Sequence, residues 1–227
     1  MGKIHRSGRE GRWLAIARLL LPMGWVLAAV GYYGPWIAHP TVALTLSGVD
    51  LGEFVKFLPG VLDGSLPMVR QLFYLPPLAV VVSVALLIGS RRLSYPWPLR
   101  VLALLLAVPV SLQLLPPAWS PSSLITAEFR LQVIALGICW LLLAGFGLWG
   151  RLPGWITASL SVLLSLAAVT LSSWQFLEVK PAIDQVYGSQ RALAPVGWGF
   201  FLCLVGLLLV AAGSVLLGLQ DRAPRVS

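Results

Sequence analysis

Few side chains of this sequence could do chemistry, and most of those that could fall in one polar stretch, residues 34–71. Asp50, Glu53 and Asp63 could bind a cation, and His39 with Asp50 and Glu53 could serve an enzyme acting on lipid at headgroup level. Helix capping and solvated charge explain the three acids without a ligand, and a hydrogen bond to backbone or water accounts for His39. The pattern therefore favours no catalytic or metal-binding site.

Catalytic signatures point the same way. The sequence contains no HExxH, CxxC, GxSxG or GxxxxGK[ST] pattern. It lacks the signatures of zinc proteases, dithiol redox proteins, serine hydrolases and P-loop proteins. Cys139 and Cys203 both fall inside hydrophobic runs, where packing is the expected role of a cysteine. We expect a protein that is not an enzyme and holds no cofactor or metal.

Composition indicates what must position these residues. Of the 227 residues, 58% are hydrophobic and 11% charged, and the mean hydropathy is +0.88, which is typical of a membrane protein. Six apolar runs approach the roughly 20 residues that a helix needs to cross about 30 Å of hydrocarbon. They are Leu14–Tyr33, Leu72–Ser90, Val101–Trp119, Leu131–Gly150, Ile156–Gln175 and Trp198–Leu219. Backbone groups in lipid must be satisfied within the segment, so helices are expected.

The third run is the least regular, because Pro109, Pro116 and Pro117 interrupt or end it. The main prediction is an all-α polytopic bundle of six spans in three hairpins. The alternative is four spans with two shorter re-entrant or interfacial segments. Residues 1–12 and 220–227 are expected as cytoplasmic tails, and residues 13–219 as a transmembrane domain with an outer loop at residues 34–71.

The net charge of +8 is unevenly placed along the chain. With six spans and an internal N-terminus, the inner segments carry 11 of the 16 basic residues: Lys3, Arg6, Arg9, Arg12, Arg18, Arg91, Arg92, Arg100, Arg151, Arg222 and Arg225. The outer segments carry the other five together with the acids Asp50, Glu53, Asp63, Glu128, Glu178 and Asp184. This positive-inside pattern predicts a plasma-membrane protein with both termini in the cytoplasm. Because orientation and lipid headgroups account for the charge, no nucleic-acid partner is expected.

A short amphipathic helix is expected within the outer loop. Asp50 is suited to cap it, and the chain should leave it after Leu58, at Pro59 and Gly60. Apolar positions repeat at helical spacing on one face, with Glu53 and Lys56 on the other. These apolar positions are Leu51, Phe54, Val55 and Leu58. Such a helix should lie on the outer membrane surface or over the ends of the spans.

Two pieces of this region, GYYGPW at residues 31–36 and SGVDLGEFVKFLPG at residues 47–60, carry a resemblance. They resemble the first outer loop of uncharacterised polytopic bacterial membrane proteins. The likeness covers residues 31–60 and implies a membrane protein of unknown activity, so it assigns no functional residue. From their type and position, Tyr32, Tyr33 and Trp36 are expected at the outer interface.

Small residues line one face of four predicted spans, at the spacing that lets two helices approach closely. They are Gly24, Ala28 and Gly31 in the first span, Gly137, Ala144 and Gly147 in the fourth, Thr157, Ser161, Ser165, Ala168 and Ser172 in the fifth, and Gly206 and Gly213 in the sixth. Helix packing is the expected role of all of them. The stripe in the fifth span could alternatively line a polar path.

These features favour a non-enzymatic integral membrane protein, an accessory or scaffold subunit that contacts membrane lipids and packs against other membrane-protein subunits or copies of itself. The alternative is a small channel or carrier for a neutral or apolar solute, lined by the fifth-span stripe and Gln113. Proton-coupled transport is disfavoured, because no ionisable residue lies near the middle of a predicted span. Such a residue costs at least about 2.5 kcal/mol to insert and usually marks function.

Overall fold

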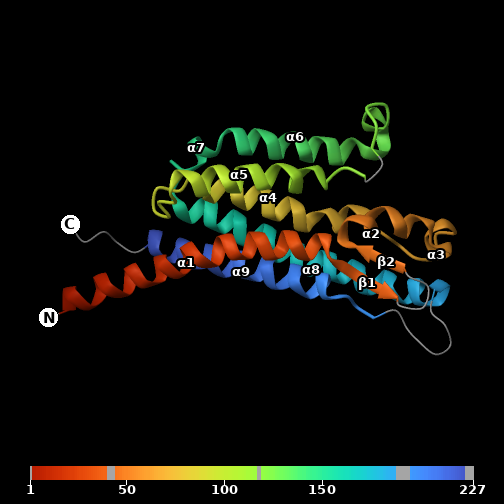
Figure 1. Ribbon diagram of the computed structural model, residues 1–227, viewed down its shortest axis with the longest axis horizontal. Coiled ribbons are helices and arrows are strands. Elements are labelled where there is room, and N and C mark those ends of the chain that lie inside the picture. The colour runs from red at the N-terminus through yellow and green to blue at the C-terminus, as the bar shows by residue number, and fades with distance from the viewer. Residues whose placement is uncertain (1, 40–43, 117–118, 188–194, 223–227) are drawn as a thin grey trace.

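The computed structural model describes residues 2–39, 44–116, 119–187 and 195–222. Its long helices lie side by side in one elongated bundle (Figure 1). Within the described residues, five helical segments are long and apolar enough to cross a membrane: Gly11–Tyr33, Arg70–Leu87, Ala127–Ala144, Gly154–Val186 and Trp198–Asp221. The predicted all-α transmembrane bundle is confirmed, with a small two-stranded sheet added to it.

In chain order the helices are α1 (Gly2–Tyr33), α2 (Gly48–Phe54), α3 (Pro59–Leu62), α4 (Leu75–Leu87), α5 (Trp97–Leu112), α6 (Arg130–Ala144), α7 (Phe146–Trp149), α8 (Gly154–Tyr187) and α9 (Trp198–Arg222). The strands are β1 (Pro35–His39) and β2 (Leu44–Ser47), and short 3₁₀ helices occupy Val55–Phe57, Arg70–Tyr74, Ser123–Ile125 and Ala127–Phe129. The first turns of α1 and the last turns of α9 lie at one end of the bundle, which we call the terminal end (Figure 1). The sheet, α2 and α3 lie at the opposite end, the cap end (Figure 1).

The third predicted span is the main departure from expectation. α5 has 16 residues, which rise about 24 Å, so it is shorter than the hydrocarbon thickness of about 30 Å. Pro109 lies in its last turn and the helix ends at Leu112. The predicted span Val101–Trp119 was wrong at both ends, because α5 starts and stops earlier.

Other boundaries also shift. α8 runs on to Tyr187, past the predicted end of the fifth span, and its additional turns bury Val179 and Ile183. Packing at the cap end therefore continues the helix beyond the apolar run. The predicted fourth span breaks at Gly145, between α6 and α7, and α1 already begins at Gly2, inside the predicted tail.

α1 and α9 form a close helix pair through their small residues. A methyl group on Gly24 would lie 2.7 Å from the carbonyl oxygen of Gly206. Gly31 faces the α9 backbone in the same way, Gly206 faces Ala28, and Gly213 lies against leucines of α1. A side chain larger than hydrogen would force the two backbones apart. The small faces predicted on the first and last spans therefore meet each other inside the chain.

At the cap end, β1 and β2 pair antiparallel and lead into α2. The residue that caps α2 is Ser47, one turn before the predicted cap. Asp50 occupies the third helical position, and its Oδ2 accepts a hydrogen bond from the Ser47 backbone nitrogen at 3.0 Å. This reciprocal capping box corrects the prediction of Asp50 as the cap. The helical segment ends at Phe57 with Leu58 extended, so the predicted stop before Pro59 and Gly60 is confirmed, and Pro59 begins a separate short helix, α3.

The cap packs over the ends of the spans, which was one of the two predicted placements. Leu51, Val55 and Leu58 are buried and Phe54 is partly buried. A methyl group on Gly52 would lie 2.9 Å from the Tyr74 hydroxyl oxygen, so α2 lies close against the segment that leads into α4. Burial of this face fixes the cap to the bundle.

Aromatic rings of the long helices pack against the cap-end residue Trp36. Trp36 is fully buried and makes edge contacts with Tyr32, Phe176 and Phe200, with ring centroids 6.2, 5.6 and 5.1 Å away. Its indole nitrogen donates to a carbonyl of α1 at 3.1 Å. Tyr32 and Trp36 were predicted at the membrane interface, but they are core residues, and Tyr33 is the exposed member of the three.

Candidate functional site

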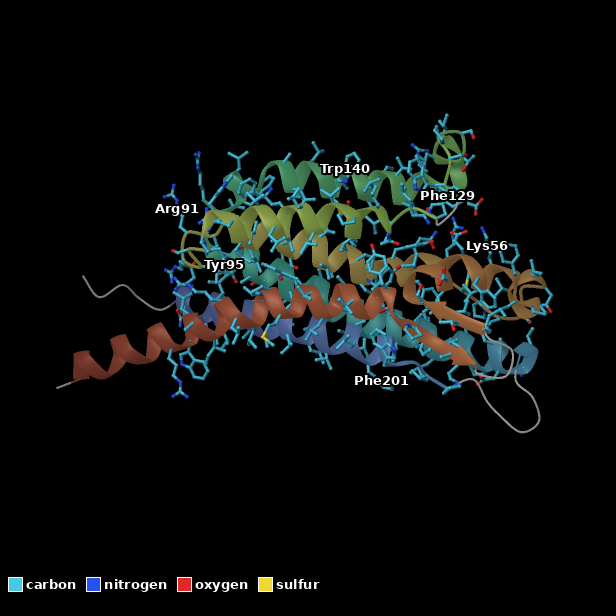
Figure 2. The ribbon with its side chains drawn as sticks, viewed as in Figure 1. Lys56, Arg91, Tyr95, Phe129, Trp140 and Phe201 are labelled. Atoms are coloured by element: carbon cyan, nitrogen blue, oxygen red, sulfur yellow. The ribbon has the colours of Figure 1, made fainter. Side chains whose placement is uncertain are left out.

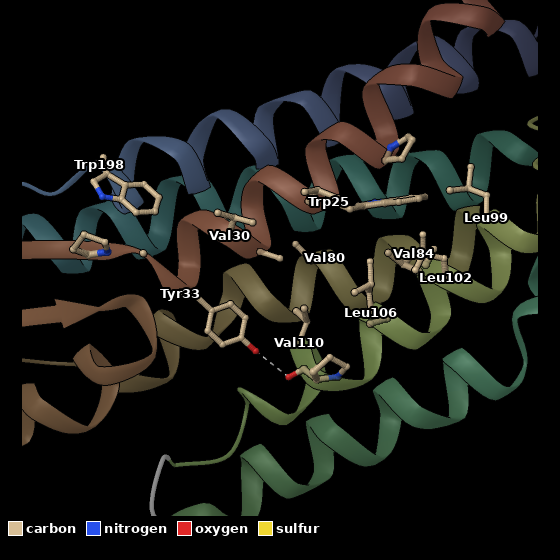
Figure 3. A pocket seen from close by; sticks show the side chains of 18 residues that line it. Trp25, Val30, Tyr33, Val80, Val84, Leu99, Leu102, Leu106, Val110 and Trp198 are labelled. Carbon is tan, nitrogen blue, oxygen red and sulfur yellow. Dashed lines mark hydrogen bonds between the residues drawn. The ribbon is translucent and has the colours of Figure 1, made fainter.

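A groove of about 650 Å³ runs between α1, α4 and α5 (Figure 3). Its volume is within the range of small-molecule sites, about 300–1,000 Å³. Its buried floor is formed by Trp25, Val80, Val84, Ala107 and Val110, and its exposed rims by Val26, Val30, Leu102 and Leu106. Because the rims face the outside of the bundle, the groove opens sideways, toward lipid.

The short helix α5 creates this groove by standing away from α1. At the cap end the two helices are joined by the Tyr33 hydroxyl, which donates to the Pro109 carbonyl at 3.3 Å (Figure 3). The Trp25 indole nitrogen donates to the Ser83 hydroxyl of α4 at 2.9 Å, so its polar atom is satisfied in the floor. The small side chain of Ala103 leaves part of the volume empty.

Two arginines flank the groove at the terminal end. Arg18 lies one helical turn before the lining residue Pro22, and Arg100 directly follows the lining residue Leu99. Tyr95 connects them, because its hydroxyl donates to the Arg18 carbonyl at 3.1 Å and its own carbonyl accepts from the Arg100 Nε at 2.8 Å.

The same tyrosine ties the arginines to the groove floor. The ring centroids of Tyr95 and Trp25 are 6.5 Å apart. Burial raises the pKa of Tyr95, so the phenol stays a neutral donor. Among the residues whose side chains are described, neither Arg18 nor Arg100 has a carboxylate within ion-pair distance. Two cationic groups therefore stand at the end of an apolar groove without a described counter-ion.

One ion pair locks the helices at the terminal end. The Arg92 guanidinium lies 2.8 Å from Asp221 and donates to the Gln220 carbonyl at 2.9 Å. Asp221 also accepts from the Trp155 backbone nitrogen at 3.1 Å, at the first turn of α8. A carboxylate at a helix N-terminus satisfies free N–H groups and opposes the helix dipole. This pair therefore joins the α4–α5 connection, α8 and α9.

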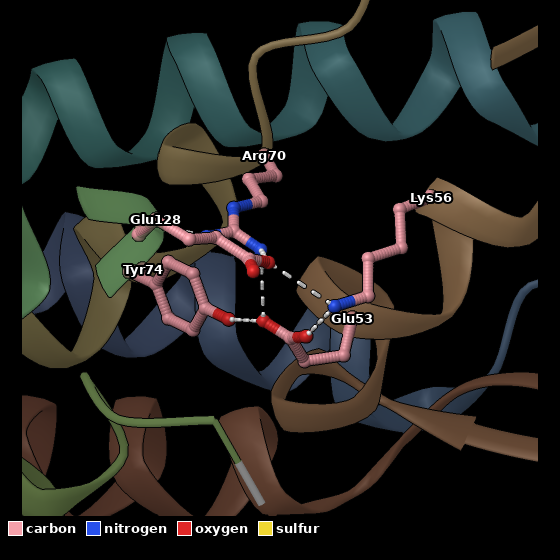
Figure 4. Close-up of polar contacts among 5 residues, drawn as sticks. All are labelled: Glu53, Lys56, Arg70, Tyr74 and Glu128. Atoms are coloured by element: carbon pink, nitrogen blue, oxygen red, sulfur yellow. Dashed lines mark hydrogen bonds and ion pairs between the residues drawn. The ribbon is translucent and has the colours of Figure 1, made fainter. Parts of the chain in front are cut away.

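The cap end holds a larger set of charges, which we call the ionic cluster: Glu53, Lys56, Arg70 and Glu128 (Figure 4). Lys56 lies 2.6 Å from Glu53, and Arg70 lies 2.7 Å from Glu128 and 3.4 Å from Glu53. The Tyr74 hydroxyl donates to Glu53 at 3.0 Å. The cluster fastens α2 and the 3₁₀ helix after it to the segment that leads into α4 and to the segment before α6.

This arrangement leaves no spare acid or base within the cluster. The Arg70 guanidinium is nearly buried and lies 5.1 Å from the Phe129 ring centroid, a cation–π distance. Burial alone would lower the pKa of Lys56, but Glu53 and then Glu128 outweigh it and raise the pKa. Figure 2 shows Lys56 and Phe129 at the cap end and Arg91 and Tyr95 at the terminal end. The cluster is suited to holding the fold.

The three acids that could have bound a cation, Asp50, Glu53 and Asp63, are not brought together in one site. Asp50 belongs to the capping box and Glu53 to the ionic cluster. Asp63 accepts from the Ser65 backbone nitrogen at 2.9 Å, and hydrogen bonding to Ser65 lowers its pKa. Across the described residues, no three histidine, cysteine or acidic side chains are placed to hold a metal ion. The side chain of His39 lies outside the described part of the chain.

The fifth-span stripe lies in helix contacts. The Ser161 hydroxyl meets that of Ser214 on α9 at 2.9 Å, and both are fully buried. Thr157 and Ser172 donate to carbonyls of their own helix. Ser165 is buried, and its hydroxyl has no hydrogen-bond partner among the described residues. This geometry favours packing over a polar path.

The fourth-span face has a different environment from all the other small faces. Gly137 and Ala144 are exposed, and a methyl group placed on Gly137 would have nothing within 4 Å. Exposed Ile134, Leu141 and Leu148 continue the same side of α6 and α7. Trp140, three residues after Gly137, borders this face and is also exposed, and its indole nitrogen donates to a hydroxyl of α5 at 3.0 Å. The Gly137 face therefore points away from the chain.

Sequence reasoning missed the groove and the pairing of Arg70 with Glu128. A signal for the pair existed, since both residues were assigned to outer segments with opposite charge. No comparable signal marks the groove, because its walls come from three helices whose relative placement no local pattern specifies. Arg18 and Arg100 were used as topology markers and were not linked to a binding site.

No protein-family model, curated protein or solved structure matches this chain. The groove, the charges at the two ends of the bundle and the α6 surface are the features of the described residues that bear on function.

Proposed function

We propose that this chain is a non-enzymatic accessory or scaffold subunit that packs laterally against other membrane proteins or a second copy of itself. The observation that carries the proposal is the empty space beside Gly137 on α6. Glycine costs about 1 kcal/mol relative to alanine inside a helix, and close backbone approach is its usual use in membranes. Gly24 and Gly206 have that approach within the chain, whereas Gly137 does not.

The surroundings of Gly137 suit a transmembrane helix of a partner. Ala144 lies seven residues further on and is also exposed, so the two small residues share one side of α6. Larger apolar side chains on the same side are Ile134, Leu141 and Leu148. Small residues between large ones form the shallow groove into which a helix packs in lipid.

A matched pair of substitutions tests this proposal. Ala144→Leu fills the α6 face, and Ala212→Leu makes the same change at an exposed position of α9. We expect extraction at native expression, followed by sizing, to give a complex for the wild type and for Ala212→Leu. Ala144→Leu should weaken association about tenfold, or about 1.4 kcal/mol. A wild-type protein that elutes as a lone monomer without a co-purifying partner would contradict the proposal.

We further propose that the protein resides in the plasma membrane of a bacterial cell with its terminal end in the cytoplasm. Six arginines whose side chains are described lie at that end, against the described acid Asp221: Arg12, Arg18, Arg91, Arg92, Arg100 and Arg151. This imbalance supports a cytoplasmic placement. A membrane-impermeant thiol reagent should label Phe57→Cys, at the exposed cap, in intact cells, and Arg151→Cys after lysis alone. The reverse pattern would reject the orientation.

A second candidate function is a carrier for a neutral or apolar solute. The groove between α1, α4 and α5 favours it, in place of the fifth-span stripe. In a liposome flux assay, Ala103→Phe should fill the groove and abolish transport, and Ser165→Ala should leave it unchanged. Loss of flux with Ser165→Ala alone would return the pathway to the serine stripe.

A further inference from the structure

The apolar groove ends next to two arginines at the terminal end of the bundle. The lining residues carry no charged side chain, and the lining extends from Pro22 and Leu99 at the terminal end to Trp198 at the cap end (Figure 3). Charged side chains flank it at the terminal end, where Arg18 and Arg100 lie. A ligand that fits both parts has an apolar chain and an anionic head.

We infer that the groove holds an acyl chain of an anionic phospholipid whose phosphate lies at Arg18 and Arg100. This inference rests on the groove of the carrier proposal and is independent of the α6 association. Exposed rims let a chain enter sideways from the bilayer, and the apolar floor removes it from contact with other lipids. The groove volume of about 650 Å³ suits a ligand of that size.

The two arginines have donors left for a phosphate. A guanidinium carries five N–H donors in a fixed fork that matches phosphate oxygens. Arg18 donates from Nη2 to the Arg92 carbonyl at 3.1 Å, and Arg100 from Nε to the Tyr95 carbonyl at 2.8 Å. Their other described N–H groups make no ion pair with a carboxylate. Anchoring by backbone carbonyls orients both cations before a ligand arrives.

At the terminal end, the two arginines are joined to the groove, which a basic surface that attracts anions in general would not require. Tyr95 joins both arginines and packs on Trp25, so the charges and the groove floor form one unit. Arg151 lies at the same end of the bundle and is exposed, but it is not among the residues that flank the groove. It provides a control for general attraction to anionic lipid.

Native mass spectrometry of the detergent-purified full chain tests the inference, with phosphatidylglycerol compared with phosphatidylcholine of the same acyl chains. We expect tighter binding of phosphatidylglycerol. Arg18→Gln and Arg100→Gln should each weaken phosphatidylglycerol binding about fivefold. Arg151→Gln should bind phosphatidylglycerol as the wild type does, and none of the three substitutions should change the binding of phosphatidylcholine. Equal binding of both lipids, or an equal loss with Arg151→Gln, overturns the inference.

A second measurement locates the acyl chain of the lipid in the wild-type protein, so it does not depend on whether a variant folds. Phosphatidylglycerol with a photoreactive group on its acyl chain should crosslink to the rims, near Val30 of α1 and Leu106 of α5. Crosslinks confined to the smaller groove between α8 and α9, near Ser214 and Gly218, overturn the inference. Ala144→Leu should leave lipid binding intact, so a failed association and a failed lipid site are distinguished.

Discussion

The two ends of the bundle arrange their charges in opposite ways. At the cap end, the ionic cluster is a closed set of two acids and two bases, linked by distances of 2.6 to 3.4 Å. At the terminal end, Asp221 pairs with Arg92 at 2.8 Å. Further arginines there have no carboxylate within ion-pair distance among the described side chains: Arg12, Arg18, Arg91, Arg100 and Arg151.

The difference shows that one residue type serves two purposes in this chain. Arg70 is buried, contacts two carboxylates, and holds the cap on the helices. Arg18 is exposed, and its described bond is to a backbone carbonyl, so its charge remains available to lipid. Substitutions at the cap end should therefore change folding stability, while those at the terminal end should change lipid binding more than stability.

The largest effect is expected from Arg70→Ala. It removes one of the two cations that Glu53 and Glu128 share and leaves both acids with Lys56 alone, and breaking a buried pair costs about 3–5 kcal/mol. Because the Glu128 side chain is 50% exposed, we expect about 2–3 kcal/mol in reversible unfolding measured in micelles. Arg151→Ala is the matched control and should change stability by less than about 0.5 kcal/mol. Equal losses from the two variants would remove the contrast between the ends.

Asp221→Ala should have an intermediate effect, because it breaks the one described ion pair at the terminal end. It removes the partner of Arg92 and the acceptor for the Trp155 backbone nitrogen. Loss of a helix cap and its charge costs about 1–2 kcal/mol. The same unfolding assay should place it below Arg70→Ala and above Asp63→Ala, whose carboxylate is exposed. A larger loss than that of Arg70→Ala would make the terminal end the more tightly fixed one.

Ser47→Ala tests whether the N-terminal capping box of α2 stabilises the cap end in addition to the ionic cluster. The substitution breaks the capping box of α2 and should cost about 1 kcal/mol. Ser47→Gly should cost a few tenths of that, because glycine is tolerated at this position, and Ser47→Thr should restore most of the loss. A loss with Ser47→Thr as large as with Ser47→Ala would show that packing at this position matters more than the hydrogen bond.

The sequence was informative wherever a single helix or its neighbour in the chain decides the structure. Gly24, Ala28 and Gly31 predicted a close helix contact, which α9 supplies. The capping box of α2 was also present in the order Ser47 to Asp50, but the acid was assigned the role of the serine. The prolines around Pro109 correctly marked the third span as irregular, although its bounds were wrong.

Features built from distant segments were beyond such reasoning. Arg70 and Glu128 are 58 residues apart in the chain and meet because the segment before α6 folds back over the cap end. The groove exists because α5 is too short and too far from α1 to close it, which depends on how three helices pack. The burial of Trp36 has the same origin, since Phe176 and Phe200 cover a ring that its position alone places at the interface.

The smallest effect concerns Lys56. Partial burial would lower its pKa, but Glu53 and then Glu128 raise it above the ordinary value. The charged Lys56 therefore makes its full contribution to the free energy of unfolding below the unfolded-state pKa of about 10.4. This contribution is lost as pH rises through the higher folded-state pKa. Its ion pairs are partly exposed to solvent, which limits the contribution to below about 1 kcal/mol. Lys56→Met should be less stable than wild type at about pH 8, and the gap should close above about pH 10.4. Comparing the two curves removes the titration of Tyr74, which both proteins share. A gap that stays constant through this range would mean that Lys56 contributes packing alone to the cap end.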